Sequence, residues 1–266
     1  ADLPVGQILI LLGIGSGSVF AALAWSKGHS LLARAAWKPA AVLRTMAEAV
    51  GAMLFATALA RVDISTVAAV FQALPLVITM AAAVFLKEQV GWRRWSAIIV
   101  GFIGVLLIIR PGLQGFEPAS VLVLLSVFAI AARDLLTRFV DASVSSTVVS
   151  FQGFASLIAA GFLLLVLIPG EVTSVSNPQA LMIFGGVVFG VMGYYGIVVA
   201  MRVGDASAVT PFRYSRLLFS ILAGMVMFDE RPDVMTMAGA TLIIGSGLYT
   251  FLRERRLARS NGMVAV

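Results

Sequence analysis

Long apolar runs alternate with short polar separators along the whole chain. Each run is about 18 to 25 residues long, enough for a helix to cross a hydrocarbon core of roughly 30 Å. The separators carry Lys, Arg, Asp, Glu, Gly or Pro. The pattern predicts an all-α, polytopic transmembrane helix bundle without a soluble domain. The nine predicted spans are 5–25, 40–60, 64–86, 93–110, 118–138, 144–168, 179–201, 206–228 and 234–252.

The composition agrees with lipid as the solvent for most of the surface. Hydrophobic residues make up 60% of the 266 residues and charged residues 12%, whereas a soluble domain has about 25% charged residues. The chain has no cysteine and one histidine, which excludes a disulfide framework, a thiolate metal site and a multi-histidine metal site. A G-x-x-x-x-G-K phosphate loop is also absent. We therefore expect no metal, no cofactor and no ATP hydrolysis by this chain.

The basic residues indicate a topology and not a nucleic-acid partner. With the C-terminal tail in the cytoplasm, twelve of the 19 Lys and Arg fall on the cytoplasmic side. Only Arg61, Arg110 and Arg231 fall on the opposite side, as the positive-inside rule requires. Nine spans then put Ala1 outside. We expect a first helix to be missing before Pro4, and ten helices in all.

A weak internal repeat supports ten helices. A shift of about 142 residues aligns the stretch from Val62 to Glu88 with the stretch from Val203 to Glu230. The first copy ends in a predicted cytoplasmic loop and the second in an external one, so the copies are inverted. We expect repeats at 1–112 and 113–266. The matched pairs are Asp63 with Asp205, Ser65 with Ser207, Val67 with Val209 and Glu88 with Glu230.

Several short motifs, in order along the chain, resemble one family. They are PVGQI from Pro4, KEQVGWRRW from Lys87, GFIGVLLIIRPG from Gly101, TPFRYSRLL from Thr210 and GATLIIGSG from Gly239. The chain resembles the EamA-type ten-helix exporters of the drug/metabolite transporter superfamily, which include aromatic amino acid exporters of the YddG type.

The resemblance implies ten helices, cytoplasmic termini, a central substrate cavity and alternating access. It implies export of amino acids, with aromatic and other neutral ones as candidates, or of related metabolites from a bacterial cytoplasm across the inner membrane. A monomer is expected, with protons as an open coupling ion. Import of another metabolite is the alternative.

Ionisable residues inside the bilayer are the best pointers to a site, because each costs about 2.5 to 3.5 kcal/mol on insertion scales. Arg216 and Arg213 lie one turn apart in the span 206–228. Together they could receive a substrate carboxylate. The alternative is that they pair with internal carboxylates and hold helices together.

Glu48 is the natural counter-charge, either as a proton-titrating or amine-binding group or as an i,i+4 partner of Arg44. We favour the second interpretation, with Arg44 snorkelling to the interface. We interpret Arg133 and Asp134, near the end of the span 118–138, as a solvated helix end.

Polar and aromatic residues complete the predicted substrate site. Gln72 is the repeat mate of Tyr214, and Pro75 frees a backbone carbonyl in mid-span. Phe71 could add an apolar wall. Tyr194 and Tyr195 share a helix with Gly186, Gly190, Gly193 and Gly196, which permit close helix contact. Interhelical packing is the alternative for all of these residues.

An enzyme is the competing class of function. It would need a nucleophile with a base, or paired acids, at mid-membrane depth. The chain has no G-x-S-x-G and no H-E-x-x-H motif. A channel would need a ring of repeated polar residues. The sequence therefore favours a secondary transporter whose partners are a small molecule and the lipid bilayer.

Overall fold

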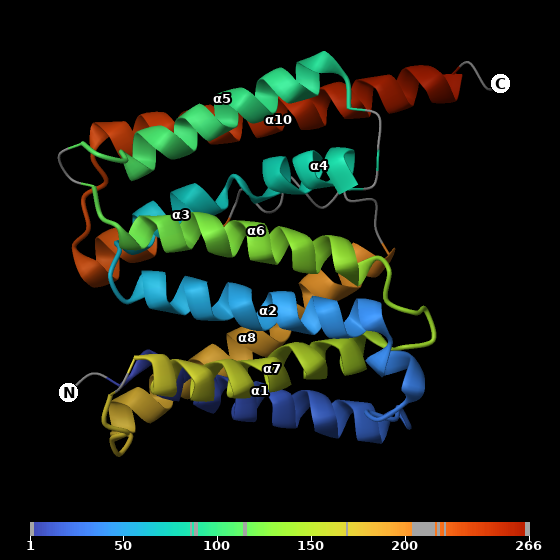
Figure 1. Cartoon of the computed structure of the whole chain (residues 1–266), viewed down its shortest axis with the longest axis vertical. Helices are drawn as coiled ribbons and strands as arrows, with labels where there is room; N and C mark the ends of the chain where they lie inside the picture. The colour runs from blue at the N-terminus through green and yellow to red at the C-terminus, as the bar shows by residue number, and fades with distance from the viewer. Residues whose placement is uncertain are drawn as a thin grey trace. The chain divides into compact units, whose positions relative to one another are not determined.

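The computed structural model is all-helical over the residues it describes, which are 3–85, 87, 90–113, 116–168, 170–203, 216, 219–220 and 222–263. Figure 1 shows the helices. Their bounds are α1 Val5–Ser26, α2 Pro39–Leu59, α3 Ile64–Phe71, α4 Leu74–Phe85, α5 Trp92–Ile109, α6 Ala119–Thr137, α7 Ser146–Leu167, α8 Asn177–Val203 and α10 Val234–Met263, with a short 3-10 helix, η1, at Arg34–Trp37.

The helix ends follow from local sequence. Pro39 occupies the first turn of α2, where its missing N–H costs nothing. The Ser145 hydroxyl accepts a hydrogen bond from the N–H of Val148 and so caps α7. The chain leaves α5 through Arg110 in the left-handed conformation (φ 52°), directly before Pro111.

The predicted spans agree with the structure. In the described part of the chain, eight segments are long and apolar enough to cross a membrane. Their bounds differ from the predicted ones by at most two residues, except that α10 continues to Met263, past the predicted end at 252. The ninth predicted span, 206–228, lies mostly outside the described residues.

The predicted span 64–86 is broken in the middle. α3 ends at Phe71 and α4 begins at Leu74, with i→i+3 hydrogen bonds from the N–H groups of Gln72 and Ala73 between them. Pro75 has no N–H to offer the carbonyl of Phe71, and its ring crowds that carbonyl. The span predicted as continuous over 64–86 is therefore interrupted just before Pro75.

The chain divides into two compact units. Unit 1 contains residues 1–60 and 132–204, and unit 2 contains residues 61–131 and 205–266. Each unit therefore takes helices from both predicted repeats.

In unit 1, α1 packs along α7, α2 packs on α7, and α8 contacts α1 and α7. The α1–α7 pair is antiparallel and depends on glycines. A Cβ added to Gly6 would lie 2.5 Å from the carbonyl oxygen of Gly161, and one added to Gly161 would lie 2.5 Å from that of Gly6. The backbones touch because neither residue has a side chain.

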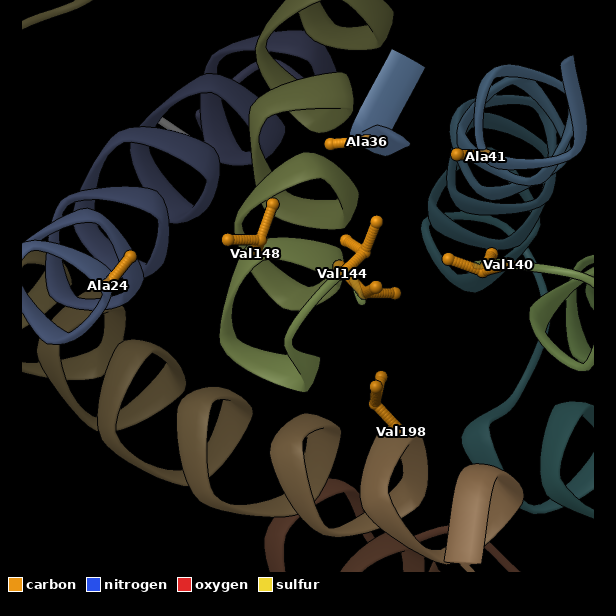
Figure 2. Close-up of a cluster of buried hydrophobic side chains, with 8 residues drawn as sticks. Ala24, Ala36, Ala41, Val140, Val144, Val148 and Val198 are labelled. Carbon is orange, nitrogen blue, oxygen red and sulfur yellow. The ribbon is translucent and has the colours of Figure 1, made fainter. Parts of the chain in front are cut away.

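One end of unit 1 is sealed by a cluster of small and branched apolar side chains. Figure 2 shows them converging from α1, η1, α2, α7, α8 and the loop before α7. Tyr194 of α8 packs against this cluster. The members are Ala24, Ala36, Ala41, Val140, Val144, Val148, Val149 and Val198, none more than 8% exposed.

In unit 2, α5 lies beside α10 (Figure 1) and also contacts α3 and α4. Here too two glycines meet. A Cβ on Gly104 would lie 2.6 Å from the carbonyl oxygen of Gly239, and a Cβ on Gly239 would lie 2.5 Å from that of Gly104. Both units are thus organised around a close glycine contact between two helices.

We expect Gly161→Ala to destabilise the protein by about 1–3 kcal/mol, because the methyl group must displace the backbone of α1. The control is Gly185→Ala on α8, where an added Cβ meets nothing within 4 Å. That variant should be neutral or slightly stabilising, since alanine favours a helix. Unfolding in detergent micelles measures both. Equal stability of the two variants would refute the close α1–α7 contact.

Candidate functional site

Four charged side chains are buried together in unit 1. Arg44 and Glu48 come from α2, and Arg133 and Asp134 come from the last turns of α6. Their exposed fractions are 1%, 5%, 7% and 1%. We call these four residues the ionic cluster. Two guanidinium groups face two carboxylates, so the cluster carries no net charge, which reduces the cost of burying it.

Glu48 joins the two arginines. Nη1 of Arg133 donates to both oxygens of Glu48 at 3.2 Å. Nη2 of Arg44 donates to Oε2 of Glu48 at 3.4 Å. One carboxylate therefore links α2 to α6.

The other guanidinium nitrogens of the two arginines also donate hydrogen bonds. Arg133 donates to Oδ1 of Asp134 through Nε at 2.9 Å and through Nη2 at 2.7 Å. Arg44 donates from Nε to the hydroxyl of Thr137 at 3.1 Å and from Nη1 to the carbonyl of Val149 at 3.5 Å. Arg44 thereby contacts α7 as well.

Tyr194 of α8 completes the network. Its hydroxyl donates a short hydrogen bond to Oε2 of Glu48 and accepts one from Nη2 of Arg44 at 2.7 Å. The two guanidinium carbons lie 5.9 Å (Arg44) and 5.7 Å (Arg133) from the centre of the Tyr194 ring. The hydroxyl fits because the facing residue on α7 is Gly153, where an added Cβ would overlap it.

An aromatic row continues from the ionic cluster. The ring centres of Tyr194 and Phe154 are 4.9 Å apart, those of Phe154 and Phe20 are 5.7 Å apart and nearly parallel, and those of Phe20 and Tyr195 are 6.1 Å apart. We call these four residues the aromatic row. The rings already contact one another, so a flat aromatic molecule could stack against the end of the row, at the half-buried Tyr195.

Four buried polar oxygens in unit 1 make no hydrogen bond to any described residue: those of Ser16 on α1, of Ser150 and Gln152 (Oε1) on α7, and of Thr173 (Oγ1) before α8. Buried polar atoms are nearly always hydrogen-bonded, to protein or to something else. These oxygens are therefore free to bind water or a ligand.

The arrangement suits a zwitterion. A molecule carrying one carboxylate and one ammonium group could bind its carboxylate to the arginines and its ammonium to Glu48. The cluster would stay neutral, so exchanging internal ion pairs for ligand contacts would bury no unpaired charge.

The structure places the other predicted site residues in unit 2. Gln72 is buried and its Nε2 has no hydrogen-bond partner among the described residues. The guanidinium carbon of the exposed Arg216 lies 4.4 Å from the ring centre of Phe71. Pro75 is half-buried at the helix break. Arg213 and Tyr214 lie outside the described residues.

Two expectations about charged residues are wrong. Arg133 and Asp134 do not form a solvated helix end, since they are 7% and 1% exposed. Arg44 does pair with Glu48, but it is buried and does not snorkel to the interface. In both cases tertiary contacts bury the residues near a helix end. Each of the two sequence pairs, Arg44 with Glu48 and Arg133 with Asp134, combines one positive and one negative charge. This charge balance was the signal in the sequence that could have indicated burial.

The predicted role of the α8 glycines in close helix contact is not seen at every position. A Cβ on Gly193 or Gly196 meets nothing within 4 Å, whereas one on Gly186 would lie 3.0 Å from the Leu12 side chain. The tightest contacts with the backbone of another helix are at Gly6, Gly161, Gly104 and Gly239. Glycine spacing alone did not distinguish these positions.

Membrane-length helices with a buried polar centre define a polytopic helical membrane protein. The chain belongs to the EamA-like transporter family, whose family model matches residues 2–110 and 118–252. The family inferred from the sequence motifs is thereby confirmed.

Two curated relatives are informative. The S-adenosylmethionine uptake transporter of Rickettsia prowazekii is 29% identical over 194 residues, covering 73% of this chain. The riboflavin transporter of Vibrio cholerae is 30% identical over 226 residues, covering 84% of this chain and 75% of the relative. The chain spans 65% of the length of the S-adenosylmethionine transporter. Neither name supports the expected export of amino acids.

A solved crystal structure shares the fold. The TM-score is 0.65, and the match covers 97% of this chain and 90% of the other at 22% identity. At this identity the likeness concerns the fold alone.

We expect Glu48 and Arg133 to be strongly coupled. In a cycle of Glu48→Gln, Arg133→Met and the double variant, the coupling free energy should reach about 2–3 kcal/mol, because each single variant leaves the buried cluster with an uncompensated net charge, which the double variant removes. Reversible unfolding in micelles provides the four stabilities.

The matched control is the Lys38–Asp141 ion pair of unit 1, 2.5 Å long, whose side chains are 59% and 30% exposed. Hydrogen bonds from Lys38 and Ser143 hold the pKa of Asp141 well below its usual range, but solvent screens such a pair. Its coupling should be within error of zero. Equal coupling in the two pairs would contradict the buried network.

Gly153→Ala should displace the Tyr194 hydroxyl from Glu48 and cost about 1–3 kcal/mol, the typical price of an unsatisfied buried polar group. The cost should be smaller in a Tyr194→Phe background, where the overlapping oxygen is gone. Gly193→Ala, one residue before Tyr194 and in open space, is the control. An equal cost of Gly153→Ala in both backgrounds would disprove the contact.

Proposed function

We propose that the protein is a secondary transporter for a small metabolite that carries an amino acid headgroup and a flat aromatic ring, with S-adenosylmethionine as the first candidate. The single observation that carries the proposal is the neutral, buried ionic cluster beside an aromatic row in unit 1.

The headgroup contacts follow from charge. A substrate carboxylate would bind Arg44 and Arg133, and arginine favours such contacts because its planar donors match a carboxylate. The substrate ammonium would take the place of a guanidinium at Glu48. The aromatic row and the unpaired oxygens of Ser16 and Gln152 would receive the ring and the ring's polar atoms.

The relatives support a ring-bearing substrate. S-adenosylmethionine and riboflavin, named for two of them, both contain a flat heteroaromatic ring and a hydroxylated sugar-derived group. Only S-adenosylmethionine also has an amino acid headgroup. Of the two, it alone matches both parts of the site. Its sulfonium adds one positive charge beyond the zwitterionic headgroup, and the ring faces of the aromatic row would stabilise that charge.

Alternating access between two inverted repeats would move the substrate across the bacterial inner membrane, with the C-terminus in the cytoplasm. The repeat division at 1–112 and 113–266 is supported by the two segments that the family model matches, 2–110 and 118–252. The names of the relatives favour a carrier over an enzyme. Export of aromatic amino acids would use the same headgroup contacts and is the second candidate function.

In proteoliposomes we expect saturable uptake of radiolabelled S-adenosylmethionine, inhibited by excess L-methionine or L-tryptophan. Glu48→Gln should reduce the initial rate at least about tenfold, because losing a charged hydrogen-bond partner costs about 1.5–3 kcal/mol. Asp141→Asn, which changes a carboxylate outside the site, should leave the rate unchanged.

The same assay separates the alternatives. Transport of L-tryptophan without S-adenosylmethionine would select the amino acid function. Transport of riboflavin alone, unaffected by Glu48→Gln, would overturn the proposal. Repeating the assay with and without a pH gradient shows whether protons drive transport.

A further inference from the structure

A polar cavity lies in unit 2 and is lined by none of the residues of the ionic cluster. Its volume is about 360 Å³. It is formed by the chain between α2 and α3, the end of α5 with the loop to α6, and the start of α10. We call it the loop-end cavity. Its charged residues are Arg61, Asp63, Arg110, Glu117, Arg231 and Asp233.

Three of these charged residues already form ion pairs or hydrogen bonds within the protein. Arg110 forms a salt bridge with Asp233, and the hydrogen bond from Arg110 lowers the pKa of Asp233 to about 2. Oδ1 of Asp233 also accepts from the N–H of Thr236 and caps α10. Glu117 accepts from the N–H of Ala119 at the start of α6. These three residues shape the wall of the cavity.

Asp63 is in the N-cap position of α3 but makes no capping hydrogen bond. Glu230, distant in the sequence, caps α3 in its place. Its Oε1 accepts from the N–H of Ile64 at 2.6 Å, and its Oε2 accepts from the N–H of Ser65 at 2.9 Å. An aspartate at an N-cap usually bonds its own helix. Here the Asp63 carboxylate is left to line the cavity.

Arg61 and Arg231 are the remaining cations. Neither forms an ion pair with a described residue, and both line the cavity, as does the buried Ser65. Among the described residues, the charged cavity groups without an ion pair or a side-chain hydrogen bond are therefore the guanidinium groups of Arg61 and Arg231 and the carboxylate of Asp63. Arg61, Arg110 and Arg231 are also the three arginines that the charge count assigned to one side of the membrane, and all three line this cavity.

We propose that the loop-end cavity is a second, weaker binding site for the amino acid headgroup of the substrate, with Arg61 and Arg231 binding its carboxylate and Asp63 its ammonium. This inference rests on the proposed function, since it assumes the same class of substrate.

Size and exposure agree with a weak site. Ligand pockets have volumes of about 300–1,000 Å³, so this cavity has room for a headgroup with part of a side chain. Arg61, Asp63 and Arg231 are exposed, and solvent screens contacts made by exposed charges. The site should therefore bind at least about tenfold more weakly than the buried ionic cluster.

Equilibrium binding of radiolabelled S-adenosylmethionine to the full chain in nanodiscs tests the proposal. We expect a tight and a weak component. Glu48→Gln should remove the tight component and spare the weak one. Arg231→Gln and Asp63→Asn should each weaken the weak component at least tenfold and spare the tight one, which also shows that these variants fold. Arg34→Gln, an exposed arginine outside the cavity, should change neither component.

Competition identifies the recognised group. L-Methionine, which has the headgroup without the nucleoside, should displace the weak component. 5′-Methylthioadenosine, which has the nucleoside without the headgroup, should not. 3-(Methylthio)propionate, which lacks the ammonium group, should compete at least tenfold less well than L-methionine, because it cannot bind Asp63.

Three results would overturn the second site: a single binding component, a weak component that Arg231→Gln and Asp63→Asn both leave unchanged, or displacement by 5′-methylthioadenosine and not by L-methionine. If the tight component alone persists and depends on Glu48, the proposed function survives. If Glu48→Gln has no effect on binding, the proposed function fails. The effects of Arg231→Gln and Asp63→Asn on the weak component then test the loop-end cavity separately.

Discussion

The carboxylate of Glu48 is the interaction on which unit 1 depends. It accepts from Arg44 on its own helix, from Arg133 on α6 and from Tyr194 on α8. Three helices are thereby joined at one side chain in a region where charge is expensive. The charged partners depend on one another, because removing one of them leaves the buried cluster with an uncompensated net charge. The same mutual dependence lets a zwitterion replace the internal pairs without leaving the site charged.

The surrounding packing protects this network. Gly153 leaves room for the Tyr194 hydroxyl, and the glycine contact between Gly6 and Gly161 brings α1 close to α7. The apolar cluster of Figure 2 packs against Tyr194. Low local polarity strengthens the remaining hydrogen bonds. The stable network and the proposed binding site thus rest on the same few residues.

Run length and helix-breaking residues were sufficient to predict most of the fold. The bounds of eight membrane-length segments follow from apolar runs, and the break before Leu74 follows from Pro75. Glu48 and Tyr194 were also identified as site candidates from sequence. Arg133 and Asp134 were not, because their burial comes from contacts between α6 and helices distant in sequence. For the same reason, glycine spacing on α8 did not reveal that the tight contacts lie on α1, α7, α5 and α10.

A structure determined with bound S-adenosylmethionine tests the central claim most directly. We predict that the headgroup carboxylate lies between Arg44 and Arg133, with its ammonium within hydrogen-bond distance of Glu48 and its adenine ring against the aromatic row. A ligand bound elsewhere in the bundle, with the hydrogen bonds between Glu48, both arginines and Tyr194 unchanged, would contradict the account and make the ionic cluster a purely structural element.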